Sequence, residues 1–172
     1  MARGREAILV TGTVLVVLYA QLMYLVTQVL TPLSTTPGKT LAEIAAAADA
    51  AGEPVFTPLA VALPLGGVAL AVAVLVTALR SRAFRSEWVA LAYLTLVACG
   101  LPVYFALAFG VGMSLADLGG VLPVTGGDSD VWLVLANASF AAFSLALGVS
   151  AGLVVRRAGR GTRTLVGPRP AR

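Results

Sequence analysis

Residues 7–30 read AILVTGTVLVVLYAQLMYLVTQVL, a stretch of 24 residues without Asp, Glu, Lys or Arg. A bilayer core of about 30 Å is crossed by about 20 helical residues, so this stretch is long enough to span a membrane. Hydrocarbon offers no hydrogen-bond partners, and a helix satisfies its own backbone. The stretch also exceeds the about 7–15 apolar residues of a secretory signal, so we expect a permanent span.

Three further uncharged stretches follow along the chain, at residues 55–79, 88–111 and 131–155. The 172 residues are 59% apolar or aromatic and only 12% charged, whereas roughly a quarter of the residues in a soluble domain are charged. The sequence therefore predicts an all-α polytopic membrane protein. We expect residues 1–155 to form one domain, a four-helix transmembrane bundle.

The basic residues are divided unequally between the connecting segments. Eleven of the twelve lie before the first stretch, between the second and third, or after the fourth, and Lys39 alone lies on the other side. Basic residues in short flanking segments stay on the cytoplasmic side of a membrane. Both termini are therefore predicted to be cytoplasmic. The excess of Arg over Lys, together with abundant Ala, Gly and Val, indicates a prokaryotic plasma membrane as the location.

The C-terminal segment at residues 156–172 contains six arginines among glycine, proline and threonine. It shows no apolar periodicity, so we expect a disordered cytoplasmic tail. Its charges are suited to anionic lipid heads. It has no aromatic side chains on which bases could stack, so no nucleic-acid partner is expected.

The first external loop contains signals for a short helix. Thr40 and Glu43 have the spacing of a capping box, and Gly52 stands where a helix would stop. We therefore expect an external helix over residues 41–51. Pro58 and Pro64 are expected to bend the second span, because proline removes a backbone donor from a helix.

The composition excludes several kinds of chemistry. The chain has no histidine and a single cysteine, Cys99, which excludes imidazole catalysis, His-ligated metals and paired-thiol redox sites. An ionisable residue inside a span usually marks an ion or proton pathway, and the four stretches contain no acidic or basic residue. We expect a protein that is not an enzyme and that has no cofactor and no metal site.

Uncharged polar residues gather on one side of the first span. At about 100° per residue, Gln21, Tyr24 and Gln28 share a narrow sector of the helix. Amide groups that faced lipid would lack partners, so this side is expected to face other helices or a wet cavity. One interpretation is a seam of the bundle. The other is a polar vestibule that accepts a small ligand or a lipid head.

Small and weakly polar residues form similar faces on the third and fourth spans. Such residues let helix backbones approach closely, and their side chains form hydrogen bonds between helices. We expect them to pack either within the bundle or against another subunit. The residues of this predicted seam are Thr95, Cys99, Asn137, Ser144, Gly148 and Gly152.

These features favour a small integral membrane protein without catalytic activity. The leading hypothesis is an accessory or scaffold subunit that packs with itself, as a homo-oligomer, or with a larger membrane partner. The alternative is a transporter or channel for a small solute or lipid, with the vestibule on the first span.

Overall fold

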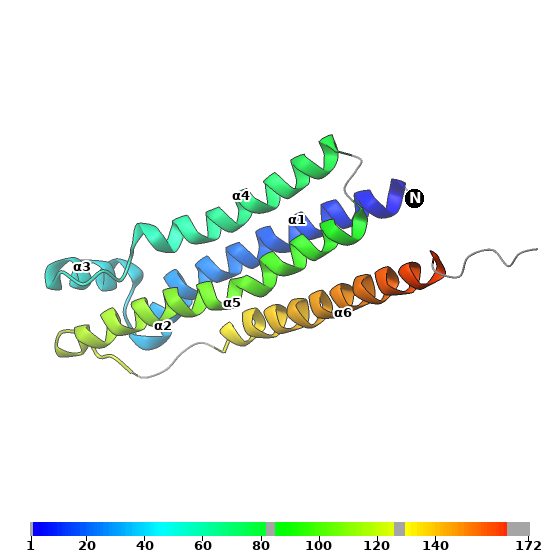
Figure 1. Ribbon diagram of the computed structural model, residues 1–172. Coiled ribbons are helices and arrows are strands. Elements are labelled where there is room, and N and C mark those ends of the chain that lie inside the picture. The colour runs from blue at the N-terminus through cyan, green and yellow to red at the C-terminus, as the bar shows by residue number, and fades with distance from the viewer. Residues whose placement is uncertain (1, 82–84, 126–129, 165–172) are drawn as a thin grey trace, which may run out of the picture.

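The computed structural model describes residues 2–81, 85–125 and 130–164, and the regular structure within these ranges is entirely helical. Four helices are long and apolar enough to cross a membrane. This confirms the all-helical fold and the expected four helices with the length and composition of membrane spans. Figure 1 shows the long helices alongside one another, with the N-terminus and the end of α6 at one end of the bundle and α3 at the other.

The first spanning segment is one long helical rod with a local change of pitch. It consists of α1 (Ala2–Leu25), a π-helical turn η1 (Val26–Leu30) and α2 (Thr31–Thr35). The backbone N–H of Thr31 bonds to the carbonyl of Val26, five residues back. Pro32 follows directly and cannot donate a backbone hydrogen bond. The π-helical turn therefore lies where the series of α-helical hydrogen bonds is interrupted.

The other three spanning helices match the predicted stretches, with different ends. They are α4 (Pro58–Arg80), α5 (Ser86–Asp117) and α6 (Trp132–Thr164), and a short 3₁₀ turn, η2 (Leu118–Gly120), follows α5. Pro58 begins α4 instead of bending it, because the first turn of a helix needs no N–H donor from that residue.

The C-terminal tail differs from the expectation of disorder. Helix α6 continues through residues 156–164, which fits the high helix propensity of arginine. The rest of the predicted tail, residues 165–172, lies outside the described residues. The charged segment therefore prolongs the fourth spanning helix by about two turns.

The predicted external helix is present as α3 (Leu41–Ala51). The backbone N–H of Thr40 donates to a carboxylate oxygen of Glu43 at 2.8 Å, and the N–H of Glu43 donates to the Thr40 hydroxyl at 3.3 Å. Gly52 ends the helix in the left-handed region, with φ 73°. On its inner side, Ile44 belongs to the same buried cluster as Leu115 of α5. The loop helix is thus packed onto the bundle.

Two tyrosines hold α1 and α5 together by lying on glycines of the opposite helix. The ring of Tyr93 from α5 covers Gly12 of α1, and the ring of Tyr19 from α1 covers Gly100 of α5. A Cβ atom at Gly12 would lie 2.4 Å from the Tyr93 ring, and one at Gly100 would lie 2.3 Å from the Tyr19 ring. Each glycine is therefore required for this close approach.

The hydroxyl groups of these tyrosines reach the remaining helices. Tyr19 Oη lies 2.8 Å from the hydroxyl of Ser139 on α6, and Ser139 donates to the carbonyl of Val97 on α5 at 2.9 Å. Tyr93 Oη lies 2.9 Å from the Thr13 hydroxyl and 3.4 Å from a carbonyl of α4. Polar contacts between spanning helices contribute about 0.6 kcal/mol each on average. Together with the glycine contacts, they fix the helix positions.

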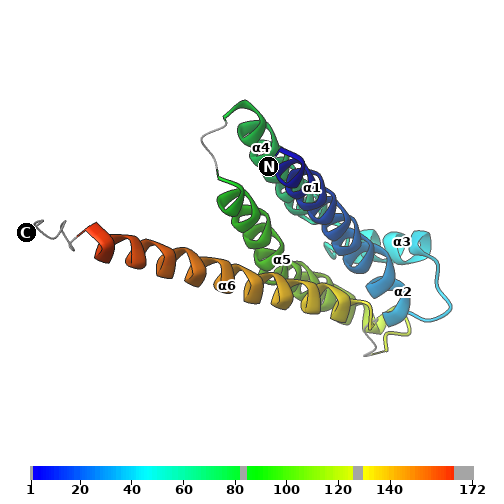
Figure 2. The same ribbon diagram turned by 90° about the vertical axis from the view of Figure 1, so that its right-hand side faces the viewer.

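The helices are arranged asymmetrically around this contact. Helix α1 packs against both α4 and α5, whereas α6 packs mainly against α5. Figure 2 shows α6 leaving the other helices toward its C-terminal end. At the end of α4, Arg5 of α1 donates hydrogen bonds to the carbonyls of Ala78 and Ser81. The first two spanning helices are therefore tied together at their ends as well.

Replacing Gly100 with alanine tests the contact between glycine and tyrosine. Overpacking a filled contact costs about 1–3 kcal/mol, so Gly100→Ala should lower the midpoint of unfolding in mild detergent. Gly110 on the same helix is the matched control, because a Cβ there meets nothing within 4 Å. Gly110→Ala should leave the midpoint unchanged or raise it. Equal midpoints for the two variants would contradict the close approach.

The capping box predicts a pH response of α3. The Thr40 backbone N–H, the Thr40 hydroxyl and the nearby Lys39 lower the pKa of Glu43 from its ordinary value. The ionised Glu43 carboxylate therefore stabilises α3 fully above the ordinary pKa of a glutamate, and this stabilisation is lost as the pH falls through the lowered pKa of Glu43. Helicity of α3, read from backbone chemical shifts, should therefore decline as the pH falls below the ordinary pKa of a glutamate and through the lowered pKa of Glu43.

Glu43→Ala should reduce the helicity of α3 at neutral pH and remove most of this pH response. Asp49→Asn, within the same helix, should keep the response, because Asp49 is not part of the capping box. An unchanged pH response in Glu43→Ala would show that another group controls α3.

Candidate functional site

The structure separates the residues of the predicted vestibule. Gln21 and Tyr24 are exposed and line a shallow cavity of about 220 Å³ between α1 and α4, together with Pro64. Gln28 is buried in η1, with 5% of its surface exposed, and does not line this cavity. Its amide nitrogen has no hydrogen-bond partner among the described residues. The structure thus brings Gln21 and Tyr24 together and places Gln28 elsewhere.

The residues of the predicted seam lie on the outside of the single chain. All six are exposed, namely Thr95, Cys99, Asn137, Ser144, Gly148 and Gly152. The contact between α5 and α6 is formed by other residues, including the buried Leu135 and Ser139. Sequence periodicity alone identified a face of small residues but not the direction in which it points.

On α6, the small residues lie on a different side of the helix from the Ser139 contact with α5. At about 100° per residue, Gly148 lies roughly opposite Ser139, which bonds to the α5 backbone. Ser144, Gly148 and Gly152 also line one side of a cavity of about 430 Å³, which reaches Glu87 at the start of α5. From Asn137 to Gly152 these small residues are exposed, and the last three border the space between the diverging ends of α5 and α6. We call Asn137, Ser144, Gly148 and Gly152 the small face of α6.

Charged side chains connect the diverging ends of α5 and α6. A carboxylate oxygen of Glu87 lies 3.0 Å from a guanidinium nitrogen of Arg85 and 3.6 Å from one of Arg156. The guanidinium of Arg157 lies 5.5 Å from the centre of the Trp88 ring. Such a cation–π contact is worth about 0.5–1 kcal/mol at an exposed site. The open end of the bundle therefore carries arginines held by side chains of α5.

Sequence reasoning did not identify these contacts or the two glycine–tyrosine pairs. The pairs leave one signal: Gly12 and Tyr19 are seven residues apart on α1, and Tyr93 and Gly100 are seven apart on α5. Seven residues are nearly two helical turns, so each glycine and its tyrosine share a face. The pairing of the two faces is a tertiary feature without a local sequence signal.

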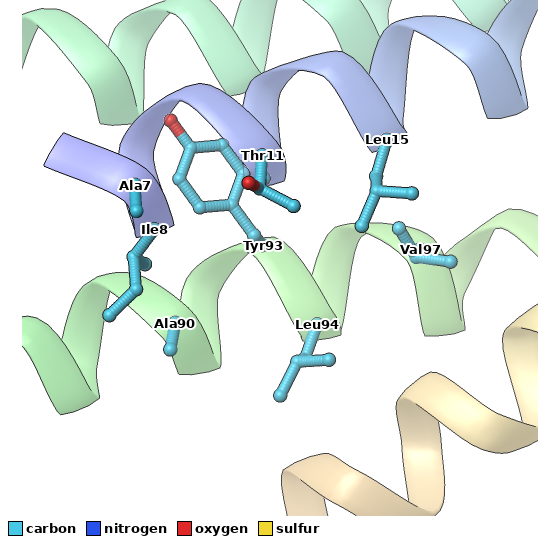
Figure 3. A pocket seen from close by; sticks show the side chains of 9 residues that line it. Ala7, Ile8, Thr11, Leu15, Ala90, Tyr93, Leu94 and Val97 are labelled. Atoms are coloured by element: carbon cyan, nitrogen blue, oxygen red, sulfur yellow. The ribbon is translucent and has the colours of Figure 1, made fainter. Parts of the chain in front are cut away.

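The α1–α5 contact leaves an apolar cavity beside Tyr93. Figure 3 shows the Tyr93 side chain projecting from α5 toward α1, near Ile8 and Thr11. The cavity has a volume of about 350 Å³ and is lined mainly by aliphatic side chains such as Leu94. The Tyr93 hydroxyl already bonds to Thr13. This arrangement offers packing surface but no reactive group.

A larger apolar groove lies alongside the contact between α4 and α5. Residues 70–78 of α4 and 88–96 of α5 border a groove of about 600 Å³, which we call the α4–α5 groove. A second cavity of about 590 Å³, the central cavity, lies between α1, α4 and α5 and reaches Cys99 and Tyr19. Leu70 and Leu96 line both spaces, so the two spaces adjoin at these residues.

These surfaces provide binding geometry without a recognisable catalytic group. Within the described ranges, no three His, Cys, Asp or Glu side chains gather closely enough to hold a metal ion. Cys99 lies at mid-helix in the wall of the apolar central cavity. Comparison of the chain with protein-family models, with curated proteins and with solved structures finds no significant match.

Proposed function

We propose that this chain is a non-enzymatic integral membrane protein that acts as an accessory or scaffold subunit and binds a transmembrane helix on the small face of α6. The supporting observation is the one-sided packing of α6. The helix rests on α5 through Ser139 and Leu135, while Gly148 and Gly152, nearer the end of α6 that diverges from α5, are exposed.

The chemistry of the small face suits helix binding. No hydrophobic force drives helices together in lipid, so close backbone approach and hydrogen bonds determine where they associate. The glycines at 148 and 152 are exposed and line a cavity beside the aliphatic side chains of Leu145 and Val149. The amide of Asn137 adds a hydrogen-bonding group near the start of α6. A second copy of the chain or a larger partner could supply the bound helix.

A transporter or channel is the weaker proposal. Gln21 and Tyr24 share only a small cavity, and Gln28 lies outside it. The largest cavities are lined by apolar side chains, so they offer no polar path for a solute.

Filling the small face tests the proposed function. A leucine at Gly148 would hold a partner helix away, because the close approach depends on the missing side chain. Protein extracted from its host membrane in mild detergent should have a particle mass above that of one chain. Gly148→Leu should shift the particle toward the single-chain mass.

Gly112→Leu on α5 is the matched control, because both Gly112 and Gly148 are exposed and a Cβ atom added at either position would meet nothing within 4 Å. The control should keep the particle mass of the wild type. A wild-type particle that contains one chain and no partner would refute the subunit role.

The proposed orientation places both termini in the cytoplasm of a prokaryotic cell. Its support is the grouping of the arginines. Arg5 bonds to the end of α4, which Arg80 terminates, and Arg85 and Arg156 meet at Glu87. Lys39 lies just before α3, and Figure 1 shows α3 at the end of the bundle opposite the N-terminus. A reporter enzyme that is active only in the cytoplasm should be active when it is fused after Arg172, and a reporter that is active only outside the cytoplasm should be inactive there. A second reporter, inserted after Gly38, should report the outside. Activity of the C-terminal fusion outside the cell would reverse the orientation.

A further inference from the structure

The α4–α5 groove has the length of a lipid chain within one leaflet. Its walls extend over residues 70–78 of α4 and 88–96 of α5, about 12 Å along each helix. One leaflet contributes about 15 Å of the hydrocarbon core. At Leu70 and Leu96 the groove adjoins the central cavity. The groove itself provides room for about 12 Å of an apolar chain that enters at Trp88.

The entrance of the groove lies at the end of the bundle that carries the arginines. Trp88 forms part of the groove wall, and the guanidinium of Arg157 lies over its ring. Arg80 lies three residues after Thr77, another wall residue, and hence on the same side of α4. Tryptophan is typical of the headgroup layer of a membrane. The entrance thus combines an interfacial aromatic ring with cations.

The charge at this end of the bundle is unbalanced. Among residues with described side chains, it carries five arginines and two glutamates: Arg5, Arg80, Arg85, Arg156, Arg157, Glu6 and Glu87. Glu87 is bound by Arg85 and Arg156, and no carboxylate among these residues forms an ion pair with Arg80 or Arg157. The two arginines nearest the groove are therefore available to an anion.

We infer that the α4–α5 groove binds an anionic phospholipid, with one acyl chain in the groove and its phosphate beside Arg80 and Arg157. The occupant is a lipid of the leaflet that contacts the arginine-rich end. The inference is independent of the small face of α6, because the groove is formed by α4 and α5 and Arg157 is not one of the four residues of that face. It differs from general attraction to a charged tail because it requires both the apolar groove and its two arginines.

Native mass spectrometry of the full chain in mild detergent tests this site. Phosphatidylglycerol and phosphatidylcholine with identical acyl chains are added separately. The wild type should retain one phosphatidylglycerol in preference to phosphatidylcholine. Each arginine near a membrane surface contributes roughly a fivefold preference, so Arg80→Gln with Arg157→Gln should lower the preference by roughly 25-fold. Lys39→Gln, at the other end of the bundle, should leave it unchanged.

Filling the groove should have a different effect. Ala92→Phe places a ring in the groove wall and should reduce retention of both lipids, whereas Ala106→Phe, on an exposed part of α5 outside the groove, should not. Ala73→Phe fills the opposite wall and serves as a second variant if Ala92→Phe unfolds, as judged by circular dichroism. Inorganic phosphate in excess should fail to displace the bound lipid.

Three results would overturn the inference. The first is equal retention of the two lipids by the wild type. The second is wild-type retention in a folded groove-filled variant, because the lipid would then be held by the outer surface of the bundle. The third is displacement by phosphate, which would identify a phosphate site without a lipid chain. Loss of the lipid with unchanged particle mass would leave the proposed subunit role intact.

Discussion

The close approach of α1 and α5 is the contact on which the rest of the fold depends. It exists because Gly12 and Gly100 have no side chains, so that a tyrosine of each helix can lie on the backbone of the other. In lipid, where apolar side chains gain nothing by avoiding water, such fitted contacts and a few hydroxyl bonds must position the helices. Tyr19 extends the contact to α6 and Tyr93 extends it to α4.

The sequence predicted those parts of the fold that depend on length and local chemistry. Four uncharged stretches sufficed for the spanning helices, and Thr40, Glu43 and Gly52 identified α3 with its observed limits. The ends of the spans were less predictable, because a helix does not stop where the hydrocarbon ends, and α6 continues into its arginines. Pro58 was predicted wrongly for the same reason. A proline can either bend a helix or stand at its first residue, and the sequence did not show at which residue α4 begins.

The candidate surfaces were harder to predict, for a physical reason. A face of small residues has the same periodicity whether it packs inside the bundle or outside it. Ser139 lies two residues after Asn137, yet one is buried against α5 and the other is exposed. The α4–α5 groove depends on the spacing of two helices and has no pattern of its own. The sequence showed the arginines near its entrance, but it did not show that they lie beside an apolar groove.

The bonds from Arg5 to the last carbonyls of α4 have a consequence for biogenesis. Helix α1 precedes α4 in the chain, and Arg5 joins the start of one to the end of the other. The two helices can therefore close as a hairpin before α5 has been synthesised. Helix α6 follows α5 and attaches mainly to it. The helix proposed to receive a partner is thus synthesised after the helix that holds it.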